Sequence, residues 1–320
     1  MKPYLPLLLS TLITFPLFAH VGDHGESDTS GQVMLTAKLD YDNEVDMVRT
    51  DSHLLITSNG IPEHSVGKFP NAGNPNRITP QQHNLKVPLN PRDTGNFNRK
   101  EGAVGIALNG VPMEPGTAET WQGDRSWRME AIVDGKSQLG LDQNNAHVQP
   151  TGSYHYHGVP HGLIDDLRRD TGTSSSEPLL IGWAADGYAI YYLKSIRPSY
   201  QLKSGSRPDG PGGRYDGTYT ADFEFVSGSG DLDEANGKFG PTPQNPEGAY
   251  HYYVTERFPF LPRVLKGEAD ESFAHPRGGG PGGRPGMRPG GSDGQRRDGP
   301  PPGERPRRHP DGPPPHLRNS

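Results

Sequence analysis

Short apolar segments alternate with turn-forming residues along most of the chain, from about residue 31 to residue 263. Segments rich in β-branched and aromatic side chains, bounded by Gly, Pro, Asn or Asp, predict strands. The predicted strands are residues 33–41, 53–57, 104–108, 180–184, 189–193, 219–226 and 249–255. Helical periodicity predicts only two short helices, at 126–133 and 163–169. We therefore expect a single, mainly β domain, sandwich- or barrel-like, with a few short helices.

Two sequence blocks occur twice within this domain. The first is an apolar strand that ends in Asn-Gly or Asp-Gly, a strong hairpin signal, at residues 104–110 and 181–187. The second begins with Leu-Asp, continues through an Asn, and ends in a Tyr-His strand, at residues 141–157 and 232–253. The order of the blocks predicts two structurally related halves, packed about a pseudo-twofold axis. The alternative is chance similarity, since such turn signals are common in Gly-rich β-proteins.

The N-terminus has the pattern of an export signal. Lys2 precedes an apolar run over residues 5–18, which Pro6 and Pro16 interrupt. The run is shorter than the roughly 20 residues that a bilayer requires. It predicts a signal peptide over residues 1–19, with cleavage after Ala19 and export to the periplasm or beyond the cell. A buried helix is the alternative, which the two prolines disfavour.

The predicted domain spans residues 31–270, between a polar, flexible start at 20–30 and a tail at 271–320. From residue 276 onward the chain is almost only Gly, Pro, Arg and Asp, with nine Arg against three Asp and one Glu. Such a segment cannot bury enough apolar surface to order itself, so we expect it to be disordered. Its positive charge indicates contact with anionic surface polymers, or a solvated spacer as the alternative.

Composition excludes several classes of function. The chain has a net charge of −6 and no interleaving of aromatic and basic residues. We therefore do not expect it to bind nucleic acid. No apolar stretch after the N-terminus is long enough to span a membrane, so we do not expect a membrane-spanning protein. The chain contains no cysteine, which excludes thiolate metal sites, iron–sulfur clusters, blue-copper centres and cysteine nucleophiles.

The Tyr-His strand at residues 154–157 carries the candidate chemistry. Side chains alternate in a strand, so His155 and His157 share one face, with Cα atoms roughly 7 Å apart. Two imidazoles so placed can converge on one metal ion, and His147 and His251 are the additional candidate ligands. Asp142 is a candidate carboxylate ligand or orienting group. The donor set suits Zn, Cu, Fe or Mn without selecting among them.

A structural interpretation of the same residues stays open. The tyrosines of the strand can be core residues with bonded hydroxyl groups, and the histidines can be hydrogen-bonded surface groups. Asp142 and Asp233 occupy positions where aspartates often form turns. If the two Tyr-His strands face each other across the pseudo-twofold axis, His251 approaches His155 and His157.

The run Ser153-Tyr154-His155-Tyr156-His157-Gly158 resembles the motif for which the YHYH domain family is named. The resemblance extends over about residues 57–266 and includes both copies of the repeated blocks. It implies an exported protein and the fold of that family, and it assigns no activity. The chain departs from the family pattern at residues 188–191, where a proline is usual, and in lacking a cysteine before the first motif.

Two hypotheses of function follow. The first is an exported protein that binds a transition metal through the His-x-His strand; in an enzyme the ion would support hydrolysis or redox chemistry, with Tyr154 or Tyr156 as proton donor. The second is a non-enzymatic envelope or surface protein that binds a polymer or partner through its Gly/Pro-rich loops and its tail. Convergence of the histidines would favour the first, and an exposed aromatic patch would favour the second.

Overall fold

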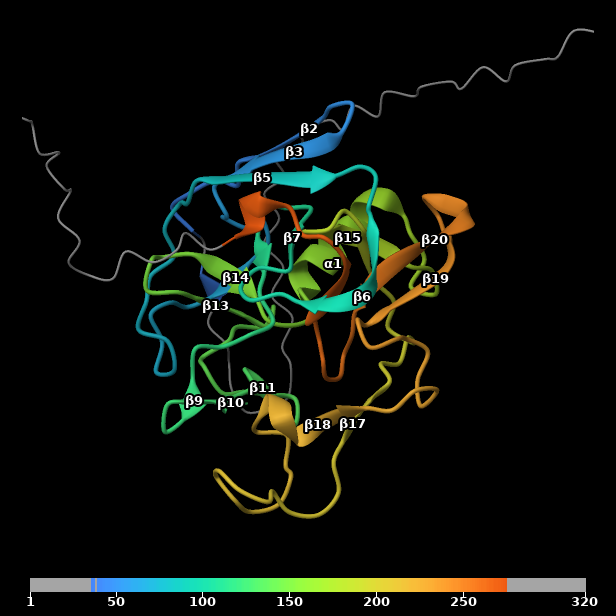
Figure 1. The fold of residues 1–320 in the computed structure, drawn as a ribbon. Helices are drawn as coiled ribbons and strands as arrows, with labels where there is room; N and C mark the ends of the chain where they lie inside the picture. Colours follow the sequence, from blue (N-terminus) through green and yellow to red (C-terminus); the bar gives the residue numbers. More distant parts are fainter. Residues whose placement is uncertain (1–35, 38, 275–320) are drawn as a thin grey trace, which may run out of the picture. The chain divides into compact units, whose positions relative to one another are not determined.

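A large mixed sheet forms the centre of the domain in the computed structural model, which describes residues 36–37 and 39–274 (Figure 1). The strand order is β13-β14-β8-β7-β15-β16-β20-β19. The strands are β13 (Ala146–Val148), β14 (Tyr154–Tyr156), β8 (Pro112–Met113), β7 (Gly105–Ala107), β15 (Leu179–Ala184), β16 (Ala189–Tyr192), β20 (Asn245–Val254) and β19 (Gly237–Thr242). The predicted β-rich fold class is confirmed.

The order of strands in this sheet is symmetric about its centre. There β7 and β15 pair antiparallel, with Ala107 opposite Gly182. On each side, a hairpin strand (β8 or β16) lies parallel to a Tyr-His strand (β14 or β20). Each Tyr-His strand then pairs antiparallel with an outermost strand (β13 or β19). The two related halves that the repeated blocks predict are therefore the two halves of one sheet.

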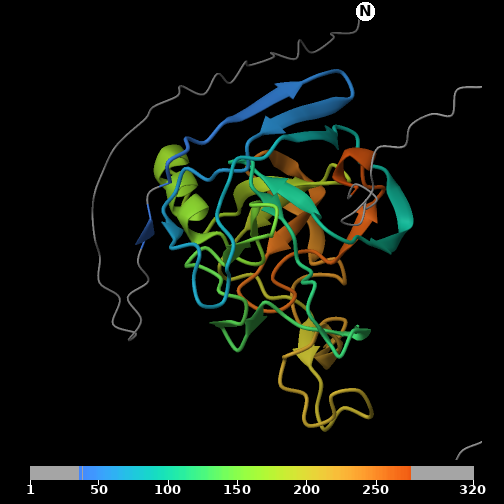
Figure 2. The ribbon, with the colours of Figure 1, turned by 90° about the vertical axis from the view of Figure 1, so that its left-hand side faces the viewer.

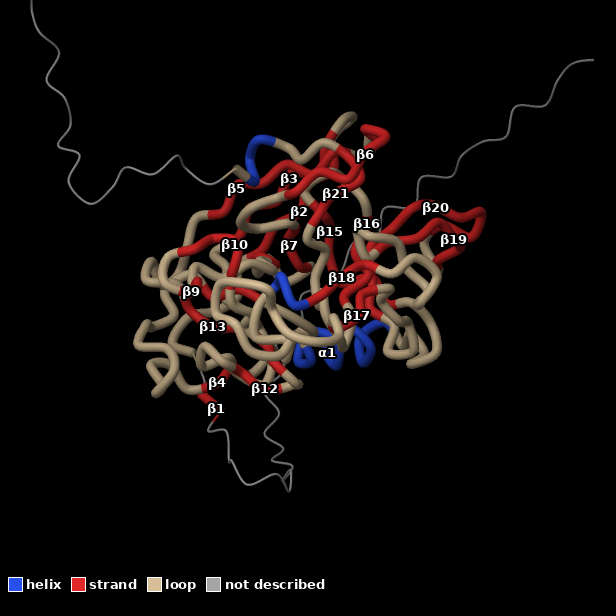
Figure 3. The backbone as a smooth tube through the Cα atoms, turned by 60° about the horizontal axis from the view of Figure 1, so that its bottom comes forward, coloured by secondary structure: helices blue, strands red, loops and turns tan. Residues whose placement is uncertain are grey.

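Smaller sheets surround the large one. The three-stranded sheet β2-β3-β5 lies at one end, and β17 and β18 lie at the opposite end (Figure 2). Much of the chain between the strands is loop (Figure 3). The remaining elements are β1 (Thr36–Ala37), β2 (Val45–Arg49), β3 (His53–Ser58), β4 (Val66–Gly67), β5 (His83–Pro88), β6 (Asp93–Arg99), β9 (Thr120–Trp121), β10 (Asp124–Arg128), β11 (Ile132–Val133), β12 (Lys136–Ser137), α1 (His161–Thr171), β17 (Tyr200–Leu202), η1 (Thr220–Asp222), β18 (Phe223–Phe225), β21 (Val264–Gly267) and η2 (Glu271–Phe273).

One of the two predicted helices is confirmed, and the other is wrong. The helix expected at 163–169 is α1, which buries Leu163 and Ile164 and ends at Gly172 in the left-handed conformation. The helix expected at 126–133 is instead β10 followed by β11. In β10 the side chain of Trp127 is buried while that of Ser126 is exposed. Trp127 is the one buried residue of β10, and eight residues were too few to distinguish a strand from a helix.

The predicted strands at 53–57, 104–108, 180–184, 189–193 and 249–255 are confirmed by β3, β7, β15, β16 and β20. The segment 219–226 is a strand only at β18, because η1 occupies its first part. Of the segment 33–41, the described residues form a strand only at β1.

The predicted signal peptide at 1–19 and the start at 20–30 lie outside the described residues. So does the predicted tail from residue 275 onward. Residues 271–274 are described, and they contain η2, whose Phe273 is buried. Within the described ranges, no helix is both long and apolar enough to cross a bilayer.

Tyrosine hydroxyl groups tie the loops of each half to the sheet in the same way. Tyr154 donates a hydrogen bond of 2.7 Å to the Asp142 carboxylate, and Tyr250 donates one of 2.9 Å to Asp233. Each aspartate also accepts from the backbone N–H groups two and four residues ahead of it. Asp142 and Asp233 are therefore turn formers bonded to the tyrosine face of the sheet.

The second tyrosine of each Tyr-His strand is also hydrogen-bonded. The amide nitrogen of Asn109 donates to the Tyr156 hydroxyl at 2.9 Å, and the Tyr252 hydroxyl donates to the Asp186 carboxylate at 2.6 Å. Asn109 and Asp186 are the turn residues of the repeated Asn-Gly and Asp-Gly hairpins. The repeated blocks thus recur as repeated contacts.

Replacing Tyr154 with phenylalanine should lower the free energy of unfolding by about 1–2 kcal/mol, because the buried Asp142 carboxylate loses a donor. Tyr250→Phe is the matched control in the other half. It should cost less, because Tyr250 and Asp233 are partly exposed and water can replace the lost donor. Urea denaturation of both variants measures the difference. Equal losses would contradict the assignment of Asp142 as the more strongly desolvated carboxylate.

Candidate metal centre

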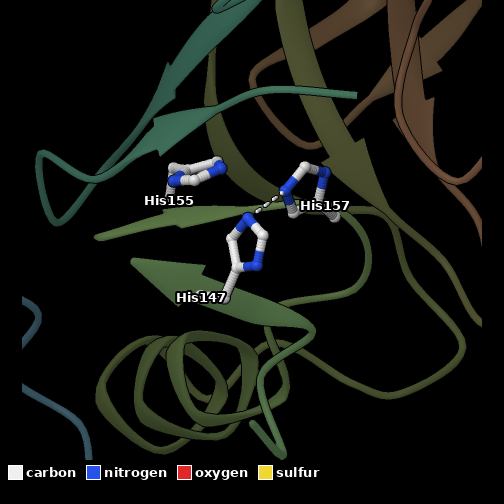
Figure 4. Close-up of side chains that lie close together, drawn as sticks. All are labelled: His147, His155 and His157. Atoms are coloured by element: carbon white, nitrogen blue, oxygen red, sulfur yellow. Dashed lines mark hydrogen bonds between the residues drawn. The ribbon is translucent and has the colours of Figure 1, made fainter. Parts of the chain in front are cut away.

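Three histidines on two neighbouring strands converge on one face of the large sheet (Figure 4). His147 on β13 lies directly opposite His155 on β14, and His157 follows β14 by one residue. Tyr154 and Tyr156 point to the other face, where both are fully buried in the core. The period of the strand therefore separates tyrosines in the core from histidines on the candidate site.

The imidazole nitrogens are close enough to hold one ion. One nitrogen from each histidine lies within 4.8 Å of the others. His157 Nε2 lies 3.0 Å from His147 Nε2. Tetrahedral coordination with bonds of about 2.0–2.1 Å places ligand nitrogens about 3.3 Å apart. The separations observed here bracket that value.

Backbone carbonyl oxygens fix the orientation of two of the rings. His147 Nδ1 lies 3.0 Å from the Leu139 oxygen, and His155 Nδ1 lies 3.3 Å from the Ser153 oxygen. Because a carbonyl oxygen only accepts, Nδ1 carries the proton and Nε2 keeps its lone pair in each neutral ring. This is the outer-sphere arrangement that orients metal-binding histidines. His157 Nδ1 is buried and has no hydrogen-bond partner within the described part of the chain.

Burial keeps the three imidazoles neutral. Burial, together with the neighbouring charge of His147, lowers the pKa of His155 to about 3. Burial also lowers the pKa of His157, with added effects of His155, His147 and Arg263. The pKa of His147 is lowered by burial as well. Neutral imidazoles are the form that binds a metal.

A cleft of about 730 Å³ opens over the histidines. Charged side chains of both signs line it, and Arg125 and Arg128 both approach Glu101, at 3.4 Å and 3.8 Å. The polar and charged lining includes Glu101, Glu114, Glu119, Arg125, Arg128, Gln149 and the three histidines. An ion held by the histidines would therefore face a space large enough for a small molecule.

A family profile described as YHYH protein matches residues 84–267, which is more than half of the chain. The chain belongs to the YHYH family. The matched region holds both repeated blocks and all three histidines of the cluster. No curated protein and no solved structure matches this chain. Membership of the YHYH family accounts for the motif, and the geometry of the site is the evidence for its chemistry.

The structure does not bring His251 to the other histidines. It lies on β20, and four strands separate β20 from β14 in the sheet. The expectation that the two Tyr-His strands face each other is wrong, because the pseudo-twofold relation places them on opposite sides of the central β7–β15 pair. His251 Nδ1 approaches the Ala249 oxygen at 2.9 Å, and its Nε2 approaches the Tyr253 hydroxyl at 3.0 Å.

Asp142 also lies apart from the histidine cluster. Its carboxylate is bonded to Tyr154 and to the backbone N–H of Gly67, on the face of β14 opposite the histidines. The prediction that Tyr154 or Tyr156 donates a proton at the ion is wrong for the same reason, since both are buried on that opposite face. Metal binding by His147, His155 and His157 stays a prediction.

The sequence did not predict the hydrogen bonds that several polar residues near the motif make. His64 lies with Nε2 2.6 Å from the Tyr156 hydroxyl, although the two residues are 92 positions apart in the chain. Glu114 and Gln149 line the histidine cleft and hydrogen-bond to each other. Glu114 reaches the cleft through the parallel pairing of β8 with β14, and no local sequence pattern predicts that pairing.

The metal-free protein should lose stability on acidification. A folded pKa of about 3 for His155, against an ordinary value of 6.5, means that the unfolded chain takes up the proton first as the pH falls below about 6.5. From His155 alone the expected loss is about 2 kcal/mol between pH 7.5 and pH 5. Urea denaturation with a chelator present measures it. His155→Gln should flatten the pH dependence, whereas His161→Gln, at an exposed position, should leave it unchanged. An identical pH dependence in His155→Gln would contradict this account.

Proposed function

We propose that this YHYH protein is an exported metal-binding protein whose ion is held by Nε2 of His147, His155 and His157. The observation that carries the proposal is the convergence of three neutral imidazoles, two of them oriented through Nδ1 by backbone carbonyl oxygens. The Nε2 lone pairs of His147 and His155, together with the 3.0 Å contact between His157 Nε2 and His147 Nε2, form a place where a cation can take the position of the shared proton.

The donor set indicates the class of ion. Imidazole nitrogen suits Zn, Cu and Fe, and the chain has no thiolate to compete for a softer ion. Three protein ligands leave at least one coordination position for water or a small molecule, which is the arrangement of catalytic rather than purely structural zinc sites. The cleft above the histidines provides access to that position. A bound ion would there polarise a bond or activate water.

The convergence of the histidines favours metal binding over the polymer-binding alternative. Among the described residues, the exposed large apolar side chains are those of Tyr41, which precedes β2, and of Val48, Leu202 and Phe239 on β2, β17 and β19. Single exposed apolar residues are ordinary on protein surfaces and do not form a binding platform.

The purified, tag-free protein should contain about one equivalent of a transition metal after incubation with Zn, Cu, Fe or Mn and removal of the excess. His155→Ala/His157→Ala should remove it, because two of three ligands are lost. His251→Ala is the matched control, since His251 occupies the equivalent position of the other half, and it should retain the metal. Elemental analysis gives the stoichiometry, and circular dichroism checks folding. Absence of metal in the parent with every ion would refute the proposal.

Export is proposed from the sequence pattern at the N-terminus. The mature protein recovered from cells should begin at His20, because cleavage is expected after Ala19. Mass spectrometry of the intact N-terminal peptide tests this. Recovery of a chain that retains the apolar run at 5–18 in the cytoplasmic fraction would contradict export.

A further inference from the structure

We propose that Glu114 is a fourth ligand of the histidine centre, so that the ion is held by three imidazoles and one carboxylate and water or a small molecule binds as a fifth ligand. This inference rests on the proposed metal-binding function and specifies it further. A mixed imidazole–carboxylate set suits divalent zinc, iron or manganese, whereas imidazole alone also serves copper.

The pairing of β8 with β14 places Glu114 on the histidine face of the sheet. Met113 is the partner of Tyr156 in this parallel pair, and both side chains point into the core. The next residue on each strand points the other way, so Glu114 shares a face with His157. The Glu114 backbone N–H donates to the Tyr156 oxygen at 2.9 Å, which continues the pairing to this position.

A hydrogen bond to Gln149 positions the Glu114 carboxylate above β14. Gln149 Nε2 donates to Glu114 Oε2 at 2.7 Å. Gln149 follows β13, and β13 and β8 lie on opposite sides of β14 in the sheet. Because both residues line the histidine cleft, their contact crosses β14 on the face that carries the imidazoles. Coordination requires the Glu114 carboxylate to turn from Gln149 toward the imidazoles.

The other half of the sheet shows that a side chain at this position reaches the histidine. Ile190 pairs with Tyr252 as Met113 pairs with Tyr156, so Tyr191 is the equivalent of Glu114. The ring of Tyr191 packs on the ring of His251, with centroids 5.1 Å apart. His251 is itself the equivalent of His155 within the repeated block.

At two further positions the second half also lacks a histidine of the first half. Lys238 lies opposite His251 where His147 lies opposite His155. Tyr253 stands in the place of His157, and its hydroxyl closes on His251. Tyr191 and Tyr253 then pack with Leu232 in a small apolar cluster. One half thus has one histidine, one lysine and two packed tyrosines at these four positions, while the other carries three imidazoles and the Glu114 carboxylate in an open cleft.

Glu114 is better placed than the other carboxylates of the cleft. Glu101 is 63% exposed at its side chain and faces Arg125. Glu119 is exposed and precedes β9 in a loop. Glu114 is half-buried, and its backbone is fixed to β14. A ligand held on the sheet has the rigidity that metal geometry requires.

The test compares Glu114→Gln with Glu119→Gln in the full-length protein. Glutamine keeps the size of the side chain and an oxygen that can accept from Gln149, so the fold should be retained. The two variants remove the same charge from the same cleft. Affinities for Zn²⁺ and Mn²⁺ are measured by competition with a chromophoric chelator, and the visible spectrum of the Co²⁺-loaded protein reports the coordination sphere.

Glu114→Gln should weaken Mn²⁺ and Zn²⁺ binding by at least about tenfold, since even outer-sphere partners of metal ligands are worth 10–100-fold. It should also change the Co²⁺ spectrum, while Glu119→Gln changes the affinity by less than about threefold and leaves the spectrum unaltered. Unchanged affinity and spectrum in Glu114→Gln, or equal losses in both variants, would overturn the assignment of Glu114. Failure of the parent to bind any of the ions would refute the histidine site itself, which is a distinguishable result.

Discussion

Alternation of side chains along β14 is the constraint on which the rest of the structure depends. Tyr154 and Tyr156 must enter the core, where their hydroxyl groups meet Asp142 and Asn109. This forces His155 and His157 onto the opposite face. A shift of one residue would place imidazoles in the core and phenols in the cleft, so the register is strongly specified. The buried tyrosines that hold the strand in the core therefore also determine that the histidines point into the cleft.

Desolvation gives the candidate site its chemical character. Burial lowers the pKa of each of the three histidines, so their nitrogens are neutral and available as ligands. The carbonyl oxygens of Leu139 and Ser153 then determine which nitrogen of His147 and His155 keeps its lone pair. The apolar side of the strand supplies the stability that allows this polar cluster to be buried.

The two halves of the sheet use one backbone arrangement for different purposes. In the second half, Tyr191 and Tyr253 seal the region around His251 with packing and hydroxyl contacts. In the first half, the equivalent space is an open cleft with ionisable groups. Such divergence within a single chain separates residues that maintain the fold from residues that carry chemistry. The Tyr–Asp contacts are common to both halves and belong to the fold.

The sequence alone determined the features that depend on neighbouring residues. The strand period placed His155 and His157 on one face, the Asn-Gly and Asp-Gly turns marked both hairpins, and the lack of cysteine limited the donor set. Only the tertiary structure decided which strands lie beside β14. The central β7–β15 pairing separates His251 from the site, and β8 brings Glu114 to it. Strand order depends on contacts between residues far apart in the chain, and local patterns of polarity do not encode those contacts.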